Sequence, residues 1–457
     1  MMQSLNIVIL AAGQGKRMNS SLPKVLHPIS TKPMLQHVLE TALQLKPSKL
    51  VVVYGHGGEQ VQNMMNPIFG NQISWAHQDV QLGTGHALKC ALHHLDDTGI
   101  TLVLYGDVPL VSVGTLQKML DKYQNSVVML TDEVDNPTGY GRVVRNNEFA
   151  ITGIVEEKDA SQSERLIREI NTGFYVLPNS KLNIWLNQLS NTNNQNEYYL
   201  TDVIGMAYAD SVDIDYVRSP YHYEVLGVNN KLQLEQLERI YQLNQANKLL
   251  EAGVTLFDRH RIDVRGSLSA GKDCSIDVNC VFEGDVKLGD NVNIGPGCII
   301  RNTTIADNVS VKAYSVIDET IINDGGQIGP FARLRPGAEL SRNVHVGNFV
   351  EIKKSYIGES SKVNHLTYIG DAEIGRGVNV GAGSVTCNYD GTNKFKTVIG
   401  DSVFIGSGTM LVAPVTVNNG STIGAGSVIT EDTPEHELTL GRAKQVTVYG
   451  WKKRNKQ

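Results

Sequence analysis

The turn that follows the first apolar segment holds the first residues able to do chemistry. Ile7–Leu10 runs into Ala-Ala-Gly-Gln-Gly-Lys-Arg-Met at residues 11–18, and Pro23-Lys24 comes shortly after. A glycine-rich turn after a strand leaves backbone N–H groups free to face phosphate oxygens, and Arg17 and Lys24 add positive charge. The turn lacks the third glycine of a dinucleotide fingerprint and the Gly-Lys-Ser/Thr of a P-loop. It therefore favours a phosphate site of another class.

A second group of polar side chains lies in the last third of the chain. It includes Arg335, Lys353 and His365, and a long polar excursion follows at residues 387–394. The excursion interrupts a repetitive segment, and a repeat that only stacks on itself does not need such a loop. Loops on a rigid scaffold commonly carry function. We therefore expect a second site here.

The elements that position the first site alternate between short β-rich runs and helical stretches over residues 1–229. Examples of the β-rich runs are Leu5–Leu10, Leu50–Tyr54 and Thr101–Tyr105, each ending near a glycine. Strands that alternate with helices predict a Rossmann-like α/β domain, with a mostly parallel sheet covered by helices on both faces.

The pattern changes over residues 230–251, where leucine and isoleucine recur at roughly helical spacing among Gln, Glu and Arg. Gly253 follows as a helix-ending residue. We interpret this segment as a linker helix between two domains.

From about residue 252, apolar residues recur every six positions. Ile276, Phe282, Leu288, Ile294 and Ile300 begin the series, and it resumes after slips as far as Ile429. Small or apolar residues follow four positions later: Cys280, Val286, Val292, Cys298 and Thr304. A hexapeptide period is typical of a parallel β-helix whose coils stack on one another, and we expect a left-handed one over residues 252–457.

Composition and length limit the remaining possibilities. A chain of 457 residues is too long for a single hydrophobic core, so two or three domains are expected. Its content of 41% hydrophobic and 19% charged residues is typical of globular proteins. A net charge of −6 without a basic stripe argues against nucleic acid as a partner. No apolar run approaches a membrane span, and the apolar start has no basic residue before it, so it is interpreted as a strand and not as a signal peptide.

The five cysteines include no Cys-x-x-Cys motif, which favours a reducing compartment, and we expect a cytoplasmic protein. Cys274, Cys280 and Cys298 fall at equivalent positions of the repeat, so we expect them to be packing residues. The basic run Trp451–Gln457 is interpreted as a solvated tail.

The glycine-rich turn, read as Leu-x-x-Gly-x-Gly-x-Arg-Met followed by Pro-Lys, resembles the signature of sugar-1-phosphate nucleotidylyltransferases. Other stretches look like that family's uracil, sugar and metal segments: Gln78, residues 81–85, 105–109, 139–142, Glu156, 171–173 and 227–229. Combined with a hexapeptide-repeat helix, the chain resembles over nearly its whole length the bacterial enzymes that are both N-acetylglucosamine-1-phosphate uridylyltransferases and glucosamine-1-phosphate acetyltransferases.

This resemblance implies two reactions in one chain. Acetyl-CoA acetylates glucosamine-1-phosphate, and UTP then donates UMP to the product with release of pyrophosphate, giving UDP-N-acetylglucosamine for peptidoglycan and lipopolysaccharide synthesis. The implied domains are a uridylyltransferase at residues 1–229, the linker helix at 230–251 and an acetyltransferase at 252–457. The family also assembles as a homotrimer.

For uridylyl transfer the resemblance implies Mg²⁺ held by Asp107 and Asn229, oxygen ligands that suit this ion. The sugar phosphate is already anionic, so no general base is needed, and catalysis by Arg17, Lys24 and the metal is positioning and charge neutralisation. The implied UTP and sugar-nucleotide residues are Leu10, Ala11, Ala12, Gly13, Lys24, Gln78, Gly83, Thr84, Tyr105, Gly106, Asp107, Gly141, Glu156, Asn171 and Asn229.

For acetyl transfer the amine must be neutral, and a histidine with a pKa near ~6.5 is a suitable base. The stretch His-Leu-Thr-Tyr resembles the acetyltransferase motif, which makes His365 the candidate. The implied amino-sugar-phosphate residues are Arg335, Lys353, Tyr368, Asn379 and Asn388. The implied acetyl-CoA residues are Ala382, Tyr389, Ser407, Ala425 and Arg442.

Two alternatives remain open. The chain could be a nucleotidylyltransferase with one activity, whose β-helix serves oligomerisation or regulation only. It could also be a non-catalytic scaffold that keeps the fold. His365 and the 387–394 excursion count against the first alternative, and intact Arg17, Lys24 and Asp107 count against the second.

Overall fold

The computed structural model describes residues 4–453, which form two compact units, one up to Tyr241 and one from Gln242 onward. The first residues of the expected initial strand and the last four residues of the basic tail lie outside the described residues. No helix within residues 4–453 is long and apolar enough to cross a membrane.

The first unit is built on a nine-stranded sheet with the order β11-β7-β10-β6-β1-β4-β5, to which β8 (Arg142–Arg145) and β9 (Ile151–Val155) attach beside β10. Neighbouring strands are parallel except that β10 is antiparallel to β6, β7 and β8, and β8 is antiparallel to β9. The predicted mostly parallel sheet is confirmed. The main strands are β1 (Leu5–Leu10), β4 (Lys49–Tyr54), β5 (Ser74–His77), β6 (Ile100–Tyr105), β7 (Val127–Glu133), β10 (Glu169–Pro178) and β11 (Ile214–Arg218).

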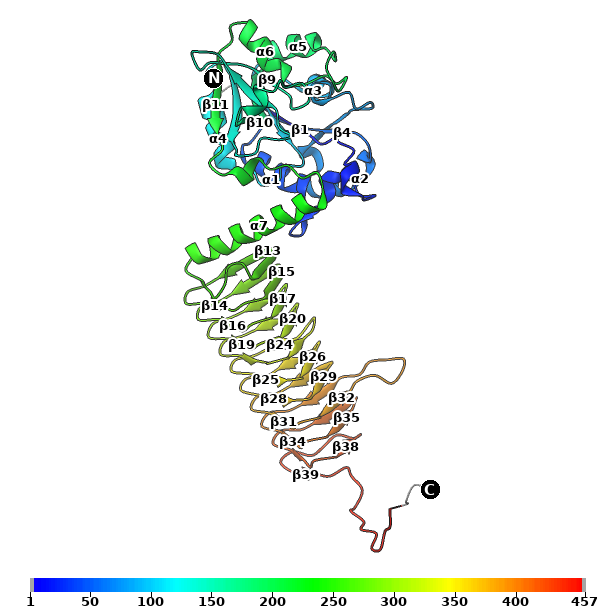
Figure 1. Cartoon of the computed structure of the whole chain (residues 1–457). Coiled ribbons are helices and arrows are strands. Elements are labelled where there is room, and N and C mark those ends of the chain that lie inside the picture. Colours follow the sequence, from blue (N-terminus) through cyan, green and yellow to red (C-terminus); the bar gives the residue numbers. More distant parts are fainter. Residues whose placement is uncertain (1–3, 454–457) are drawn as a thin grey trace. The chain divides into compact units, whose positions relative to one another are not determined.

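Helices cover both faces of this sheet (Figure 1). Side chains alternate along β1, so Ile7 and Ile9 pack in the core with α1, α2 and α4, while Val8 and Leu10 pack with α3, α5 and α6. The helices are α1 (Met34–Gln44), α2 (Gly58–Phe69), α3 (Thr84–Ala91), α4 (Val113–Lys122), α5 (Asn179–Gln188) and α6 (Asp202–Ala209).

The carboxyl ends of the central parallel strands meet at one edge of the sheet. Leu10 at the end of β1 pairs with Tyr105 at the end of β6, and the Gly106 N–H donates to the Leu10 carbonyl at 3.0 Å. The glycine-rich turn and the loop that carries Asp107 therefore leave the sheet side by side. Open α/β sheets bind ligands at this edge.

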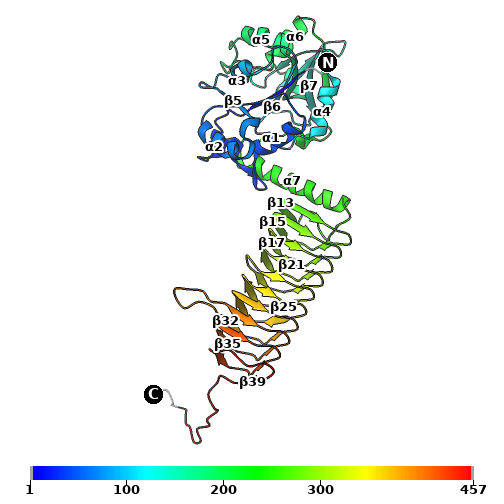
Figure 2. The same cartoon turned by 180° about the vertical axis from the view of Figure 1, so that it is seen from behind.

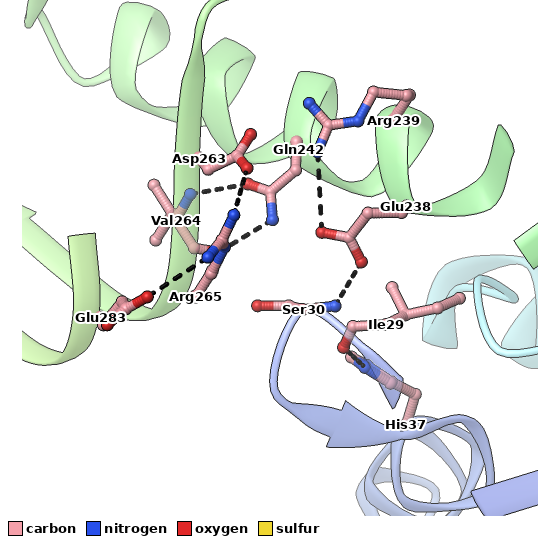
Figure 3. A network of polar contacts seen from close by, with 10 residues as sticks. All are labelled: Ile29, Ser30, His37, Glu238, Arg239, Gln242, Asp263, Val264, Arg265 and Glu283. Atoms are coloured by element: carbon pink, nitrogen blue, oxygen red, sulfur yellow. Dashed lines mark hydrogen bonds and ion pairs between the residues drawn. The ribbon is translucent and has the colours of Figure 1, made fainter. Parts of the chain in front are cut away.

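Helix α7 (Lys231–Glu251) occupies the segment where a linker helix was predicted. Its first half belongs to the first unit, where Leu237 is buried among Met18, Ile29 and Met34. There the Glu238 carboxylate also accepts the Ser30 backbone N–H at 2.5 Å (Figure 3).

The second half of α7 belongs to the second unit. Ala246 and Leu249 join the interior of the β-helix, and Gln242 is bonded to both backbone groups of Val264. Figure 3 also shows Arg265 paired with Asp263 at 3.0 Å and with Glu283 at 3.3 Å. Each half of the helix is thus fixed by packing and by polar contacts within its own unit.

The second unit is a parallel β-helix, as the hexapeptide period predicted. An 11-stranded parallel sheet runs from β12 (Thr255–Leu256) to β39 (Leu438–Thr439), and a 17-stranded parallel sheet starts with β13 (Ile262–Ala270) and β15 (Cys280–Leu288). Figures 1 and 2 show the coils stacked in chain order. The branched residues of the period fill one continuous interior, which also buries Cys274, Cys280 and Cys298.

Thr304 differs from the other small residues of this series. Thr304 is exposed, whereas Thr303 and Ile305 are buried. In this coil Asn293 pairs with Ser310, 17 residues later, whereas three full hexapeptides would span 18. The positions whose side chains point into the interior therefore move by one residue. The slip in the sequence period therefore marks a shortened coil.

The polar excursion leaves the stack between β32 (Val385–Cys387) and β33 (Thr397–Ile399), as Figures 1 and 2 show. Tyr389 and Lys394 form an antiparallel bridge, so the excursion is a small hairpin. A hairpin is consistent with a loop that holds its side chains in fixed positions.

Candidate functional sites

A hollow of about 310 Å³ opens at the carboxyl edge of the first unit's sheet. Ten of the residues expected to bind the nucleotide line it: Leu10, Ala11, Ala12, Gly13, Lys24, Gln78, Gly83, Thr84, Tyr105 and Asp107. Gly106 does not line it. Gly106 is buried, and a Cβ there would press on Ala11, Val25 and Leu35, so its lack of a side chain serves packing.

A second hollow of about 590 Å³ adjoins the first and shares three lining residues with it, Lys24, Gln81 and Glu197. Its other lining residues include Arg17 and Asn229. The two expected catalytic cations of the first unit thus line one space, and Lys24 lines both.

Lys24 makes the central polar contact between the hollows. Its ammonium pairs with the Asp107 carboxylate and lies 3.3 Å from the Asn229 side-chain oxygen. Both side chains of the ion pair are mostly buried, 13% and 16% exposed. The two expected metal ligands therefore both contact the Lys24 ammonium.

This arrangement tests whether a divalent cation fits. Asp107 and Asn229 offer a carboxylate and an amide oxygen, the hard ligands that Mg²⁺ prefers, and both already face a cation. Within residues 4–453, no cluster of three or more His, Cys, Asp or Glu side chains could hold a metal ion. A magnesium ion here would take its remaining ligands from phosphates and water, as Mg²⁺ commonly does. The donor set therefore fits the ion.

Gln78 closes the inner end of the first hollow. It is 3% exposed, and its amide N–H₂ donates to the Gly83 carbonyl at 3.1 Å and lies 3.0 Å from His86 Nδ1. Burial lowers the pKa of His86, which favours a neutral ring that accepts this hydrogen bond. Gly83 has φ 107°, and a Cβ there would lie 2.6 Å from the Tyr198 carbonyl, so only glycine fits.

Three of the four residues expected to hold the sugar, Gly141, Glu156 and Asn171, lie close together, while the fourth, Asn229, contacts Lys24. The Asn171 N–H donates to the Gly141 carbonyl at 2.9 Å, and a Cβ on Gly141 would lie 3.4 Å from the Glu156 carboxylate. Tyr105 lies near Glu156, and burial together with that carboxylate raises the pKa of Tyr105. The Glu156 carboxylate in turn accepts a hydrogen bond from the Thr201 hydroxyl at 3.0 Å.

Burial raises the pKa of Glu156, and the nearby Asp202, Asp159 and Glu197 carboxylates add to the shift, while the Thr201 hydroxyl opposes it. A raised folded-state pKa means that the folded chain binds this proton more tightly than the unfolded chain does. The charged carboxylate therefore costs stability above the raised pKa, and the cost disappears below the ordinary glutamate range.

Replacing Glu156 with glutamine removes this cost and keeps an oxygen for Thr201. We expect a higher melting temperature than wild type at pH 8, with the difference vanishing as the pH falls below the ordinary glutamate range. Thermal melts of both proteins from pH 4 to 8 check this expectation. A wild type that is the more stable protein at pH 8 would contradict it.

Three contacts at this site were not predicted from the sequence. Glu197 lines both hollows, Thr201 bonds Glu156, and the Gln81 amide donates to the Ala12 carbonyl. Glu197 and Thr201 come from the segment between α5 and α6, which carries no motif. Gln81 belongs to residues 81–85, one of the stretches that resemble the family's uracil, sugar and metal segments. The sequence therefore offered a signal for Gln81, although it was not named as a site residue.

In the second unit, the expected base His365 ends β28 (Lys362–His365), next to Asn348 at the end of β25 (His345–Asn348). The two are register partners in successive coils, and His365 Nδ1 lies 3.2 Å from the Asn348 side-chain oxygen. A proton on Nδ1 donated to this oxygen leaves Nε2 free to accept a proton, as a general base requires. His365 is exposed, so a substrate can reach that nitrogen.

Three positively charged side chains come from neighbouring coils and from the excursion. Arg335 is paired with Glu351 at 2.7 Å, and Lys353 lies 3.8 Å from Asp371. Lys394, from the excursion, lies close enough that the Lys353 ammonium lowers its pKa. Asn388 bonds the same Asp371 carboxylate.

Tyr368 and Asn379 lie on the next strands, β29 (Tyr368–Gly370) and β31 (Asn379–Val380). Tyr368 pairs in register with Glu351, and Asn379 pairs with Lys362. All five residues expected to bind the amino-sugar phosphate therefore lie on neighbouring coils, and Lys394 is an additional cation that was not assigned from the sequence.

Small residues form a column at one corner of the last coils. Ala382, Ser407 and Ala425 each lie between two glycines. They are stacked by backbone hydrogen bonds, in which the Gly408 N–H donates to the Ala382 carbonyl and the Gly426 N–H donates to the Ser407 carbonyl. Arg442 donates to the Ala425 carbonyl at 2.7 Å. Tyr389, at the base of the excursion, is 59% exposed. A corner with only small side chains leaves its backbone accessible to an elongated ligand.

Comparison with known families agrees with the two units. Residues 7–169 match the MobA-like NTP transferase domain, residues 264–338 match the GMPPB C-terminal domain, and residues 396–431 match the bacterial transferase hexapeptide family. A solved UDP-glucose pyrophosphorylase complexed with UDP-glucose is 18% identical, covers 53% of this chain and 98% of its own, and has a TM-score of 0.44.

Relatives match over the full length. The protein named "Bifunctional protein GlmU" of Chromobacterium violaceum is 58% identical over 456 residues, 100% of each chain. The protein of the same name from Azoarcus sp. is 54% identical over 454 residues, 99% of this chain and 100% of its own.

Proposed function

The chain belongs to the GlmU family, the bifunctional acetyltransferases and uridylyltransferases of UDP-N-acetylglucosamine synthesis, and we propose that each unit carries one of the two activities. The uridylyltransferase site lies within residues 1–229 and the acetyltransferase site within residues 252–457, with 230–251 as the linker helix. UTP and acetyl-CoA are the co-substrates. We place the reactions in the cytoplasm, where these co-substrates are made.

The observation that carries the proposal of two sites is the arrangement around His365. A scaffold needs only the buried branched residues and the corner glycines. Here an exposed histidine has its Nδ1 on Asn348, while Lys353 on a neighbouring coil and Lys394 on the hairpin lie close to each other. A histidine base and lysine cations are suited to acyl transfer to a phosphorylated amine, and the stacking of β-helix coils does not require them. This disfavours the alternative of a single activity.

In uridylyl transfer, a phosphate oxygen of N-acetylglucosamine-1-phosphate attacks the α-phosphorus of UTP, and pyrophosphate leaves. Mg²⁺ held by Asp107 and Asn229 would neutralise phosphate charge. Arg17 and Lys24 add positive charge from the wall of the second hollow, so the step depends on positioning and electrostatics. Gln78, Gly83 and Thr84 fix the base, while Gly141, Glu156 and Asn171 hold the sugar.

In acetyl transfer, the amine of glucosamine-1-phosphate attacks the thioester carbonyl of acetyl-CoA, and the CoA thiolate leaves. His365 Nε2 takes the proton from the amine, and Asn348 fixes the tautomer that leaves this nitrogen free. Arg335 and Lys353 bind the phosphate, and Tyr368, Asn379 and Asn388 position the amino sugar. The Ala382, Ser407 and Ala425 column with Tyr389 and Arg442 holds CoA.

A single incubation tests the proposal. Purified protein receives glucosamine-1-phosphate, acetyl-CoA, UTP and Mg²⁺, and free thiol and pyrophosphate are measured separately. We expect both to be released. Pyrophosphate that appears only when N-acetylglucosamine-1-phosphate is added, without thiol release, would reduce the β-helix to a scaffold.

We also propose that the chain assembles as a homotrimer through the β-helix. Tyr314, Phe331 and Phe349 stack at centroid distances of 5.4 and 5.5 Å on one corner of successive coils, and Leu366 continues the column. All four are 47% to 64% exposed, and Leu366 directly follows His365. An exposed apolar column of this kind marks a protein interface, and a second copy of the chain is the partner that the family implies.

Replacing Phe331 with asparagine tests the interface. Phe331 has φ 54°, a conformation that asparagine tolerates, so the coil keeps its backbone. We expect light scattering to show dissociation toward monomers and acetyl transfer to fall with it, while uridylyl transfer stays. A trimer of unchanged stability would place the interface elsewhere.

A further inference from the structure

Lys24 has an unusual position for a residue expected to contact phosphate. Its ammonium is committed to the Asp107 carboxylate and lies 3.3 Å from Asn229, so it occupies the space between the two proposed metal ligands. We propose that Lys24 is an internal competitor of the metal: the ammonium holds the two oxygens in the metal-free protein, and a divalent cation must displace it.

The glycine-rich turn accommodates the lysine in this position. A Cβ on Gly15 would lie 2.7 Å from the Lys24 Cβ, and a Cβ on Gly13 would lie 3.9 Å from the Lys24 Nζ. The side chain therefore lies along the bare backbone of the turn. A side chain at Gly15 would force the lysine away from Asp107.

The ion pair between Lys24 and Asp107, called the bridge here, also lies between the two hollows. Lys24 lines both hollows, with the expected base-binding residues in one and Arg17 with Asn229 in the other. Metal binding at Asp107 and Asn229 breaks the bridge and frees a positive charge in the wall between the hollows. The freed ammonium is then available to the triphosphate, so metal binding and nucleotide binding become coupled.

Electrostatics explains why an ammonium is suited to this exchange. It contacts the side-chain oxygens of Asp107 and Asn229, but it offers one charge where a divalent ion offers two. The ligands thus stay arranged before the metal arrives, and a weaker cation is replaced by a stronger one.

The test measures Mn²⁺ binding to the nucleotide-free protein by isothermal titration. We expect Lys24→Met to bind Mn²⁺ about tenfold more tightly than wild type, because one charge-assisted contact no longer competes. Lys16→Met is the matched control, since Lys16 lines the second hollow but is not bonded to Asp107 or Asn229 in the structure. It should change the affinity much less than Lys24→Met does.

A second measurement follows the lysine itself. Mn²⁺ should raise the rate at which an amine-acylating reagent labels Lys24 in the wild type, as quantified by peptide mass spectrometry. Equal or weaker Mn²⁺ affinity of Lys24→Met, or labelling that does not respond to Mn²⁺, would overturn the displacement.

This inference depends on the proposed metal ligands, and Asp107→Asn separates the two failures. If that variant binds Mn²⁺ as well as wild type, the metal site itself is wrongly placed. If Asp107→Asn loses binding and Lys24→Met gains none, the metal site stands and only the displacement is wrong.

Discussion

Replacing His365 with alanine is expected to lower acetyl transfer by about 10²–10⁴-fold, the usual contribution of a general base, and to leave uridylyl transfer at the wild-type rate. The histidine lies at the end of β28 with Nδ1 at 3.2 Å from Asn348, and its Nε2 is then free to take a proton from an amine. Its side chain is exposed, so its loss creates no cavity. Thiol release from acetyl-CoA and pyrophosphate release from UTP measure the two rates in one preparation.

His345→Ala is the matched control, because His345 begins the neighbouring strand β25 and pairs in register with Lys362, not with His365. It should keep both activities. Retained acetyl transfer in His365→Ala would remove this residue from the mechanism. Loss of both activities in a folded protein would contradict separate sites.

Replacing Asp107 with alanine should have the opposite effect. We expect uridylyl transfer to fall by about 10²–10³-fold or more, because the carboxylate that would hold Mg²⁺ beside the phosphates is lost, while acetyl transfer is unchanged. Asp107 is the carboxylate at the edge of the sheet that faces Lys24 and Asn229 in the structure. The same paired assays measure the effect, with N-acetylglucosamine-1-phosphate supplied for uridylyl transfer.

Asp215→Ala controls for the general effect of removing a carboxylate from the first unit. Asp215 lies on the edge strand β11 and pairs with Lys122 at 3.6 Å, away from both hollows. Wild-type uridylyl transfer in Asp107→Ala would show that this aspartate is not a metal ligand. Isosteric Asp107→Asn guards against a folding defect.

The sequence predicted the architecture well because both units have strong local patterns. The central strands were expected within one residue of their observed bounds, since each ends at a glycine or a turn. The β-helix followed from branched residues that recur every six positions, because each coil repeats the same interior. The shortened coil at Thr304 was missed, because a period alone does not show where a residue is dropped.

The internal geometry of the sites was not available from the sequence. Lys24 meets Asp107 across 83 positions and Asn229 across 205, and only the strand order of the sheet brings them together. Glu197 and Thr201 come from a segment without a motif. Asn348 stands 17 positions before His365, so the stacking of one coil on the next, and not local spacing, places it.

The two-site account is tested most directly by mixing the two variants. His365→Ala alone cannot make N-acetylglucosamine-1-phosphate, and Asp107→Ala alone cannot convert it to the nucleotide sugar. Each should therefore make almost no UDP-N-acetylglucosamine from glucosamine-1-phosphate, acetyl-CoA, UTP and Mg²⁺. Their mixture should make it after a lag, while the intermediate accumulates in solution. A mixture of folded variants that stays inactive, although each retains its own half-reaction, would contradict two independent sites joined by a free intermediate.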